Sequence, residues 1–187
     1  MIAIGIDPGT INLGWGVVRR AGNRLHHVAH GVIRVKADAP LSARLLIINN
    51  HLDAILEQYR PEMGSVEGMF FDKNAQSAAK LGHARGVVLL CLERRSVLLR
   101  EHPPARVKRT LTGNGRAEKA QVAKMVTAIL GLDTLPPADA SDALALAMTE
   151  LRLDPRAQEL DDLRRKNQRR RVPVALAQAI ARAKAAR

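Results

Sequence analysis

The feature that most constrains the fold is the run of small and β-branched residues at the start of the chain. Residues 2–7 and 14–20 are rich in Ile, Val and Gly, and a Pro-Gly-Thr segment follows Asp7 between them. This pattern is typical of two strands joined by a turn. A third strand over residues 28–35 would complete a meander, so we expect the chain to begin with a three-stranded sheet.

Helical periodicity follows the meander. Apolar residues recur at helical spacing from Leu41 to Leu56, Pro40 suits the first helical position, and residues 63–67 suit a short strand. A strand, a helix and a second strand favour parallel addition to the sheet. The remaining expected elements are helices over residues 74–95, 122–130 and 138–151 and a strand over residues 96–101. We therefore predict an α/β fold with a mixed five-stranded sheet flanked by helices.

The charge of the chain favours an anionic partner such as nucleic acid. The 187 residues include 30 Lys and Arg against 18 Asp and Glu, a formal net charge of +12. Enzymes and structural binders of nucleic acid share such an excess, so charge alone does not separate these two classes. Residues 152–187 carry 11 basic and 4 acidic residues. We expect one folded domain over residues 1–151 and a basic C-terminal tail, partly disordered or helical, over residues 152–187.

Neither a membrane segment nor a signal peptide is expected. No apolar stretch approaches the roughly 20 residues that span a bilayer, and Met1 is followed directly by Ile-Ala-Ile without a charged region. The single cysteine, Cys91, lies in an apolar run, where a buried free thiol is the usual role. This use of cysteine fits a reducing, cytosolic compartment.

Four carboxylates occupy positions that this fold could bring together. Asp7 and Glu67 each end an expected strand, the place where open α/β sheets tend to bind ligands. Asp139 and Asp142 lie three residues apart, which puts both on one face of the last helix. Taken singly, Asp7 also fits a turn residue, and the second pair also fits acids at a helix N-terminus. The set of four is more informative than any one member.

A bound cation would explain the four acids together. By strand alternation Asp7 shares a face with Ala3 and Gly5, small residues that could leave space for an ion. Clustered carboxylates raise one another's pKa values, a cost that a bound cation normally offsets. Oxygen ligands without a Cys or His cluster favour Mg²⁺ or Mn²⁺ over Zn²⁺. Two such ions, about 3.5 to 4 Å apart, are typical of two-metal phosphodiester hydrolysis.

Several short motifs occur in order between residue 1 and about residue 150. They are Gly-Ile-Asp-Pro-Gly-Thr at 5–10, Leu-Gly-Trp-Gly at 13–16, Glu67 with Phe70, Lys73, Asn74 and Ser77, Leu81-Gly82 with Ala84-Arg85-Gly86, Val107-Lys108 with Thr112, Gly113, Gly115 and Lys119, and Asp139 with Ser-Asp-Ala-Leu-Ala at 141–145. Together they resemble the RuvC family of Holliday-junction resolvases. The resemblance implies an RNase H-like nuclease domain.

The resemblance also implies the roles of particular residues. The implied catalytic residues and metal ligands are Asp7, Glu67, Asp139 and Asp142, with two Mg²⁺ ions per subunit and Mn²⁺ as the alternative. The implied DNA-binding residues are Phe70, Lys73, Asn74, Ser77, Arg85, Lys108 and Lys119. Among these, Phe70 corresponds to an aromatic residue that stacks into the junction, and the last two correspond to lysines near the scissile phosphate.

The resemblance further implies a reaction and partners. The reaction is resolution of four-way DNA junctions by symmetric paired nicks that leave 5′-phosphate and 3′-hydroxyl ends, in recombination and DNA repair. The implied partners are a second copy of the chain and the branch-migration proteins RuvA and RuvB, in the bacterial cytoplasm at the nucleoid. The helix over 74–95 is the candidate dimer interface, because Gly82 and Gly86 have a spacing typical of close packing against a neighbour.

Two other classes of protein share some of these features. The Gly-Ile-Asp-Pro-Gly-Thr motif also resembles the phosphate-binding hairpin of actin-like ATPases and sugar kinases, but those enzymes need two such domains. A nucleic-acid-binding protein with purely structural acids would bind a junction without Mg²⁺ and would not cleave it. Cleavage assays would separate the three classes.

Overall fold

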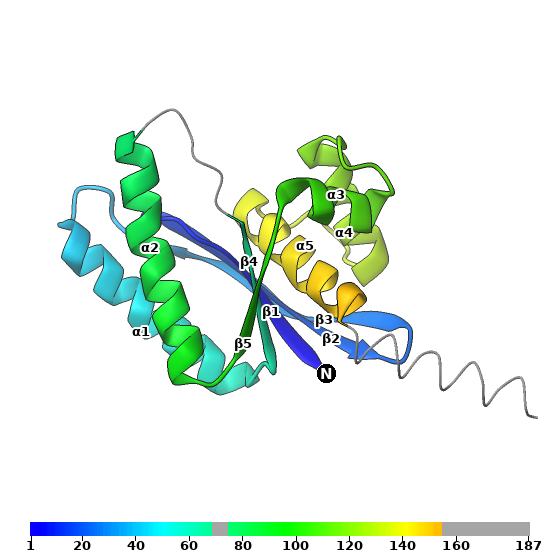
Figure 1. Ribbon diagram of the computed structural model, residues 1–187, viewed down its shortest axis with the longest axis horizontal. Coiled ribbons are helices and arrows are strands. Elements are labelled where there is room, and N and C mark those ends of the chain that lie inside the picture. Colours follow the sequence, from blue (N-terminus) through cyan, green and yellow to red (C-terminus); the bar gives the residue numbers. More distant parts are fainter. Residues whose placement is uncertain (69–74, 155–187) are drawn as a thin grey trace, which may run out of the picture. The chain divides into compact units, whose positions relative to one another are not determined.

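A mixed five-stranded sheet forms the centre of the fold (Figure 1). The computed structural model describes residues 1–68 and 75–154. The strands are β1 (Ile2–Asp7), β2 (Asn12–Ala21), β3 (Arg24–Arg34), β4 (Met63–Glu67) and β5 (Leu98–His102), in the spatial order β3-β2-β1-β4-β5. The first three are antiparallel, and β4 and β5 add in parallel to β1. The predicted meander, the parallel addition and the α/β class are confirmed.

Helices cover both faces of this sheet (Figure 1). They are α1 (Leu41–Tyr59), α2 (Ala75–Arg94), α3 (Pro104–Thr112), α4 (Lys119–Leu130) and α5 (Ala138–Leu153). One core lies between the sheet and α1 and α2, and it includes Ile4, Ile48 and Val88. A second core lies between the other face and α3, α4 and α5, and it includes Ala3 and Leu144. Successive residues of a strand point to opposite faces of the sheet, so alternate strand residues pack into one core or the other.

Helix α5 crosses β1 and β2 at unusually short range because these strands present glycines to it. A Cβ atom at Gly5 would overlap the carbonyl of Ala143, and one at Gly14 would overlap the carbonyl of Asp139. The prediction that Gly5 leaves space for an ion beside Asp7 is therefore wrong. Helix α5 fills this space. Because α5 packs directly on the glycines, its residue Asp142 lies near Asp7 at the end of β1.

Two smaller expectations need correction, and one helix was not expected. Pro40 precedes α1 as its N-cap instead of beginning the helix. Strand β5 begins at Leu98 because the chain first turns through Ser96, whose φ is 54°. An added Cβ at Gly82 or Gly86 would meet no described atom within 4 Å, so the predicted close packing of these glycines against a neighbour stays a prediction about a second copy of the chain. No strand or helix was expected over α3, where two apolar residues are buried among basic ones.

The compact unit formed by the first part of the chain runs from Met1 to Leu153. Its last helix extends two residues beyond the expected domain boundary at residue 151. No helix among the described residues is long and apolar enough to cross a membrane.

Candidate active site

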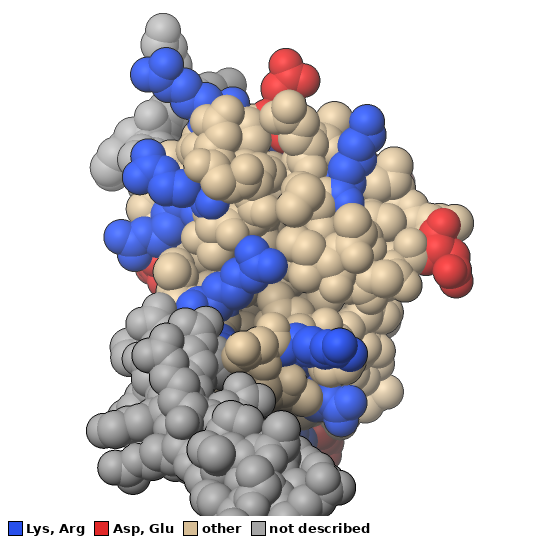
Figure 2. Space-filling view, turned by 90° about the vertical axis from the view of Figure 1, so that its right-hand side faces the viewer, with Lys and Arg blue, Asp and Glu red and all other residues tan. Residues whose placement is uncertain are grey.

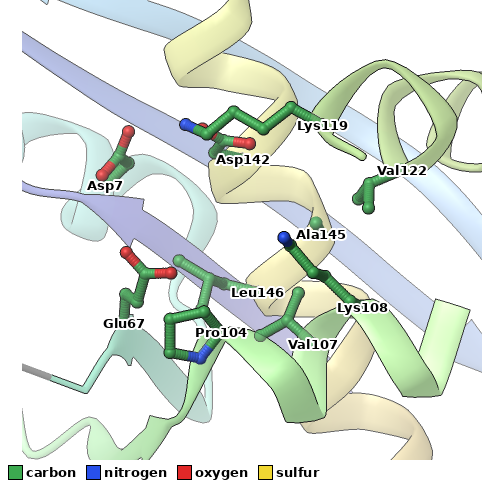
Figure 3. Close-up of a pocket in the computed structure, with 10 residues that line it drawn as sticks. All are labelled: Asp7, Glu67, Pro104, Val107, Lys108, Lys119, Val122, Asp142, Ala145 and Leu146. Carbon is green, nitrogen blue, oxygen red and sulfur yellow. The ribbon is translucent and has the colours of Figure 1, made fainter. Parts of the chain in front are cut away.

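Three carboxylates face one cavity of about 160 Å³ (Figure 3). Asp7 is the last residue of β1 and Glu67 is the last residue of β4. These strands are parallel neighbours, so their carboxyl ends lie side by side. Asp142 reaches the cavity from α5, which crosses the same strands. The predicted convergence of Asp7, Glu67 and Asp142 is what the structure shows.

The other walls of the cavity combine apolar side chains with two lysines. The lining residues besides the acids are Pro104, Val107, Lys108, Lys119, Val122, Ala145 and Leu146. Figure 3 shows both lysines extending from α3 and α4 toward the acids. Apolar walls reduce the screening of charge by water, so electrostatic interactions in the cavity are stronger than on an open surface.

The acids share an unfavourable electrostatic environment. Burial raises the pKa of Asp7 to about 7, and the negative charges of Asp142, Asp139 and Glu67 contribute to the rise, while Lys119 opposes it. Burial also raises the pKa of Glu67, and Asp142 adds to this rise. A carboxyl group whose pKa is raised to near 7 by burial and by neighbouring carboxylates is characteristic of functional sites.

Lys119 partly balances this charge. Its ammonium group donates a hydrogen bond to Oδ2 of Asp142 at 2.9 Å, and this bond raises the pKa of Lys119. The lysine side chain is 82% exposed, so the pair contributes little to the stability of the fold. Its main effect is electrostatic, because the ammonium lowers the pKa values of Asp7 and Glu67.

The donor set fits a hard divalent cation. Asp7, Glu67 and Asp142 offer oxygen ligands of the kind that Mg²⁺ and Mn²⁺ prefer, and a cation would relieve the repulsion that raises the pKa of Asp7. Within residues 1–68 and 75–154, no three Asp, Glu, His or Cys side chains are close enough to bind one ion in the present arrangement. One or two carboxylates together with water molecules are the usual ligands of Mg²⁺ in proteins.

The remaining predicted residues fall into separate groups. Asp139 does not line the cavity, although its charge acts on Asp7 from the first turn of α5. Lys108 lines the cavity and lowers the pKa of Glu67. Phe70, Lys73 and Asn74 lie outside the described residues, and so does the side chain of Ser77.

Arg85 is buried against other parts of the protein, which is unexpected for a predicted DNA-binding residue. The residue is 7% exposed, and its guanidinium donates a hydrogen bond to the backbone carbonyl of Glu67 at 2.7 Å and forms an ion pair with Glu101. A guanidinium with two protein partners and little exposed surface is poorly placed to bind a phosphate.

A buried acid with two basic partners near the site was not predicted from the sequence. Glu150 of α5 is fully buried, with Oε2 at 2.7 Å from Nε2 of His102 and Oε1 at 3.4 Å from Arg100. His102 is the strand partner of Glu67. The sequence does contain a signal, because Glu150 is a charged residue that directly follows the mostly apolar run from Ala143 to Met148 and Thr149.

A family model described as crossover junction endodeoxyribonuclease RuvC matches residues 3–150. The chain belongs to the RuvC family. A relative named crossover junction endodeoxyribonuclease RuvC from Sorangium cellulosum is 54% identical over 151 residues, which cover 81% of this chain and 84% of the relative. A relative of the same name from Heliobacterium modesticaldum is 43% identical over 149 residues, covering 79% and 92% of the two chains.

Solved structures agree with this assignment. The structure described as T. thermophilus RuvC in complex with Holliday junction substrate matches with a TM-score of 0.77 and 37% identity, over 80% of this chain and 92% of that one. The yeast mitochondrial Holliday junction resolvase Ydc2 matches with a TM-score of 0.60 at 11% identity, over 88% and 83% of the two chains, which shows a shared fold. The expected RNase H-like fold and the assignment as a nuclease of the RuvC family are confirmed, and the actin-like alternative is disfavoured.

Replacing Lys119 by Gln is expected to lower the cleavage rate by about tenfold or more, because the ammonium group that faces the three acids in the cavity is lost. Since Lys119 lowers the pKa values of Asp7 and Glu67, its removal raises both. The acidic limb of the pH–rate profile should therefore move to higher pH. Single-turnover rates across neutral pH test this expectation. Lys36→Gln, an exposed lysine outside the cavity, is the control, and an unchanged profile for the Lys119 variant would contradict the electrostatic role.

Proposed function

We propose that this chain is a structure-specific endonuclease that resolves four-way (Holliday) DNA junctions in recombination and DNA repair. The observation that carries the proposal is the cavity in which Asp7, Glu67 and Asp142 face Lys108 and Lys119. Acidic ligands for a cation and basic contacts for a phosphate are the two requirements of metal-dependent phosphodiester hydrolysis. Family membership adds the substrate class, because the T. thermophilus relative is described in complex with a Holliday junction substrate.

In the proposed reaction the acids act as metal ligands. Asp7, Glu67 and Asp142 would hold Mg²⁺, with Asp139 as a further ligand, at two ions per subunit and with Mn²⁺ as the alternative. When bound, the ions lower the pKa of water and stabilise the charge on the leaving oxygen. The raised pKa of Asp7 supports this role, because its carboxylate gains more from a cation than an isolated acid would.

The lysines would orient the DNA over these acids. Lys108 on α3 and Lys119 on α4 approach the cavity from the side opposite Asp7 and Glu67 (Figure 3), so a phosphate between the two groups would meet ammonium on one side and carboxylate on the other. We further propose, from the family resemblance, that hydrolysis leaves 5′-phosphate and 3′-hydroxyl ends. Phe70, Lys73, Asn74 and Ser77 remain predicted DNA contacts.

Positive charge on the α3 and α4 side supports binding of DNA beyond the cavity. Figure 2 shows that Lys and Arg side chains outnumber Asp and Glu on this side of the molecule. The exposed basic residues of α3, α4 and the segment between them include Arg106, Arg109, Arg116 and Lys124. Phosphate contacts from such residues supply most of the affinity for DNA and make it dependent on salt.

Paired nicks require two active sites, so we also propose a homodimer through α2. The added Cβ atoms at Gly82 and Gly86 meet nothing among the described residues, and Leu81 and Leu90 are 40% and 56% exposed. A second copy would cover this face, and sedimentation of the purified protein tests for it. Cooperation with RuvA and RuvB in the bacterial cytoplasm, at the nucleoid, completes the proposal.

The decisive test compares substrates and metals. The protein should cleave a synthetic four-way junction in Mg²⁺ at two symmetric positions, leave a linear duplex of the same sequence intact, and lose activity when EDTA removes the cation. Resealing of the products by a ligase reports the expected ends. Junction binding without cleavage, indifferent to Mg²⁺, would instead identify a binding protein with structural acids.

Removal of the tail should weaken binding while chemistry persists. Helix α5 ends at Leu153, and Arg152 donates a hydrogen bond to the carbonyl of Thr110, so the truncation should follow Asp154. Affinity for the junction should fall about tenfold at moderate salt, with a flatter salt dependence, because several phosphate contacts are lost. The cleavage rate at saturating enzyme should stay near that of the full chain. Fluorescence anisotropy over a salt series measures the slope, and an unchanged slope would assign the tail another role.

A further inference from the structure

Arg85 connects three elements at the edge of the active site. It projects from the middle of α2, donates to the backbone carbonyl of Glu67 at the end of β4, and pairs with Glu101 of β5. The guanidinium is nearly buried, whereas the Glu101 side chain is 52% exposed. A planar guanidinium with two partners in different directions holds both more rigidly than a single hydrogen bond would.

The two strand ends that Arg85 joins are already neighbours. Val66 of β4 is paired with Glu101 of β5, and Glu67 is paired with His102. The amide of Gly68 also donates to the carbonyl of His102 at 2.9 Å. The backbone of Glu67 is therefore held on one side by β5 and on its carbonyl by Arg85, while its carboxylate faces the cavity.

We propose that Arg85 is a positioning residue that fixes the backbone of Glu67 and so directs the Glu67 carboxylate into the active-site cavity. This inference rests on the proposed function. It replaces direct contact with DNA as the role of Arg85, because the guanidinium is occupied by protein partners and its exposed area is small. Glu101 takes part as the anion that keeps Arg85 in this orientation.

The two roles predict different kinetic effects. A residue that binds phosphate contributes to affinity for the junction, so its loss raises Kd and leaves the rate at saturation unchanged. A residue that positions Glu67 contributes to the rate of the bound complex, because a small misplacement of a catalytic group costs about 100-fold in rate. The neighbouring acid separates the roles further, since loss of negative charge at Glu101 would favour DNA binding but weaken the positioning of Arg85.

The test uses the full chain with Arg85→Gln, Arg85→Lys and Glu101→Gln, and with Arg94→Gln as the control from the same helix. Arg94 is exposed, as a matched arginine outside the cavity should be. Three quantities are measured for each variant: the single-turnover cleavage rate at saturating enzyme in Mg²⁺, the Kd for the junction in EDTA, and the rise in Tm on addition of Mg²⁺.

Arg85→Gln should lower the saturated rate by about 10- to 100-fold and reduce the Tm rise, with Kd changed less than about twofold. Arg85→Lys should restore part of the rate, Glu101→Gln should lower the rate by a few fold, and the control should match the wild type. A higher Kd with an unchanged rate would overturn the proposal in favour of DNA contact. A normal rate per folded molecule with a lower Tm would overturn it in favour of a purely structural role. Failure of the wild type to cleave would contradict the proposed function instead. The rise in Tm on addition of Mg²⁺, compared between the wild type and Arg85→Gln, would still test the role of Arg85.

Discussion

Replacing Asp7 by Asn is expected to abolish junction cleavage while stabilising the folded protein at neutral pH in EDTA. The Asn side chain has nearly the same shape as that of Asp7, but it lacks the negative charge that favours binding of a divalent cation. Removal of one ligand from a two-metal site should lower the cleavage rate by about 100-fold or more. Binding of the junction should persist, because phosphate contacts elsewhere dominate affinity.

The gain in stability follows from the pKa of Asp7. Burial and the neighbouring acids raise this pKa from 3.8 to about 7, so the folded state binds the Asp7 proton more tightly than the unfolded state does. The contribution of Asp7 to the stability of the wild type therefore decreases as pH rises from about 4 to about 7, and the full cost is present above about pH 7. Asn avoids this cost, which amounts to at most about 4 kcal/mol.

Denaturation at acidic and alkaline pH in EDTA measures this effect. Asp7→Asn should be close to the wild type near pH 4 and more stable above pH 7. Mg²⁺ should stabilise the wild type more than the variant, since the cation binds the folded wild-type site. Asp133→Asn, an exposed acid outside the cavity, is the control. Retained cleavage by the Asp7 variant would remove Asp7 from the catalytic site.

Replacing Gly5 by Ala is expected to destabilise the fold by about 3 kcal/mol or more. The added methyl group would overlap the carbonyl of Ala143 and the amide of Ala147, which are backbone atoms of α5. The helix cannot shift away at low cost, because it forms much of the core on this face of the sheet, including the fully buried Leu144 and Met148. Overpacking against a fixed backbone is among the costlier core substitutions.

Chemical denaturation and cleavage assays together test this expectation. If α5 moves, Asp142 moves with it, so the rate per folded molecule of Gly5→Ala should also fall. Gln58→Ala, at an exposed position of α1, is the control, because a surface substitution there should change the free energy of unfolding by no more than about 0.5 kcal/mol. A free energy of unfolding within about 0.5 kcal/mol of the wild type would contradict the close contact between α5 and β1.

Local patterns made most elements and two of the acids predictable. Alternating apolar residues define strands, and an acid that directly follows such a run is an acid at a strand end, so the amino-acid pattern alone places Asp7 and Glu67 at strand ends. The three-residue spacing of Asp139 and Asp142 likewise puts both on one helix. Helix α3 was missed because it is only nine residues long and buries just two apolar residues, Val107 and Leu111, among basic ones, which is too short a pattern to predict a helix.

Contacts between distant segments were decided by the tertiary structure. Lys119 reaches Asp142 across 23 positions of sequence, and Arg85 reaches the carbonyl of Glu67 across 18. Neither pairing follows from spacing, because the packing of separate elements brings them together. The role of Gly5 belongs to the same class, since only the path of α5 shows what its missing side chain permits.

By itself the sequence determined the order of the strands and of every helix except α3, the candidate acids and the family, because these depend on local periodicity and ordered motifs. The tertiary structure decided which acids share a cavity, since Asp139 and Asp142 lie on one helix yet only Asp142 lines it. The tertiary structure also explains why the pKa of Asp7 is about 7. Burial and the charges of residues from three other segments act on that carboxyl group together, and their distances exist only in the folded chain.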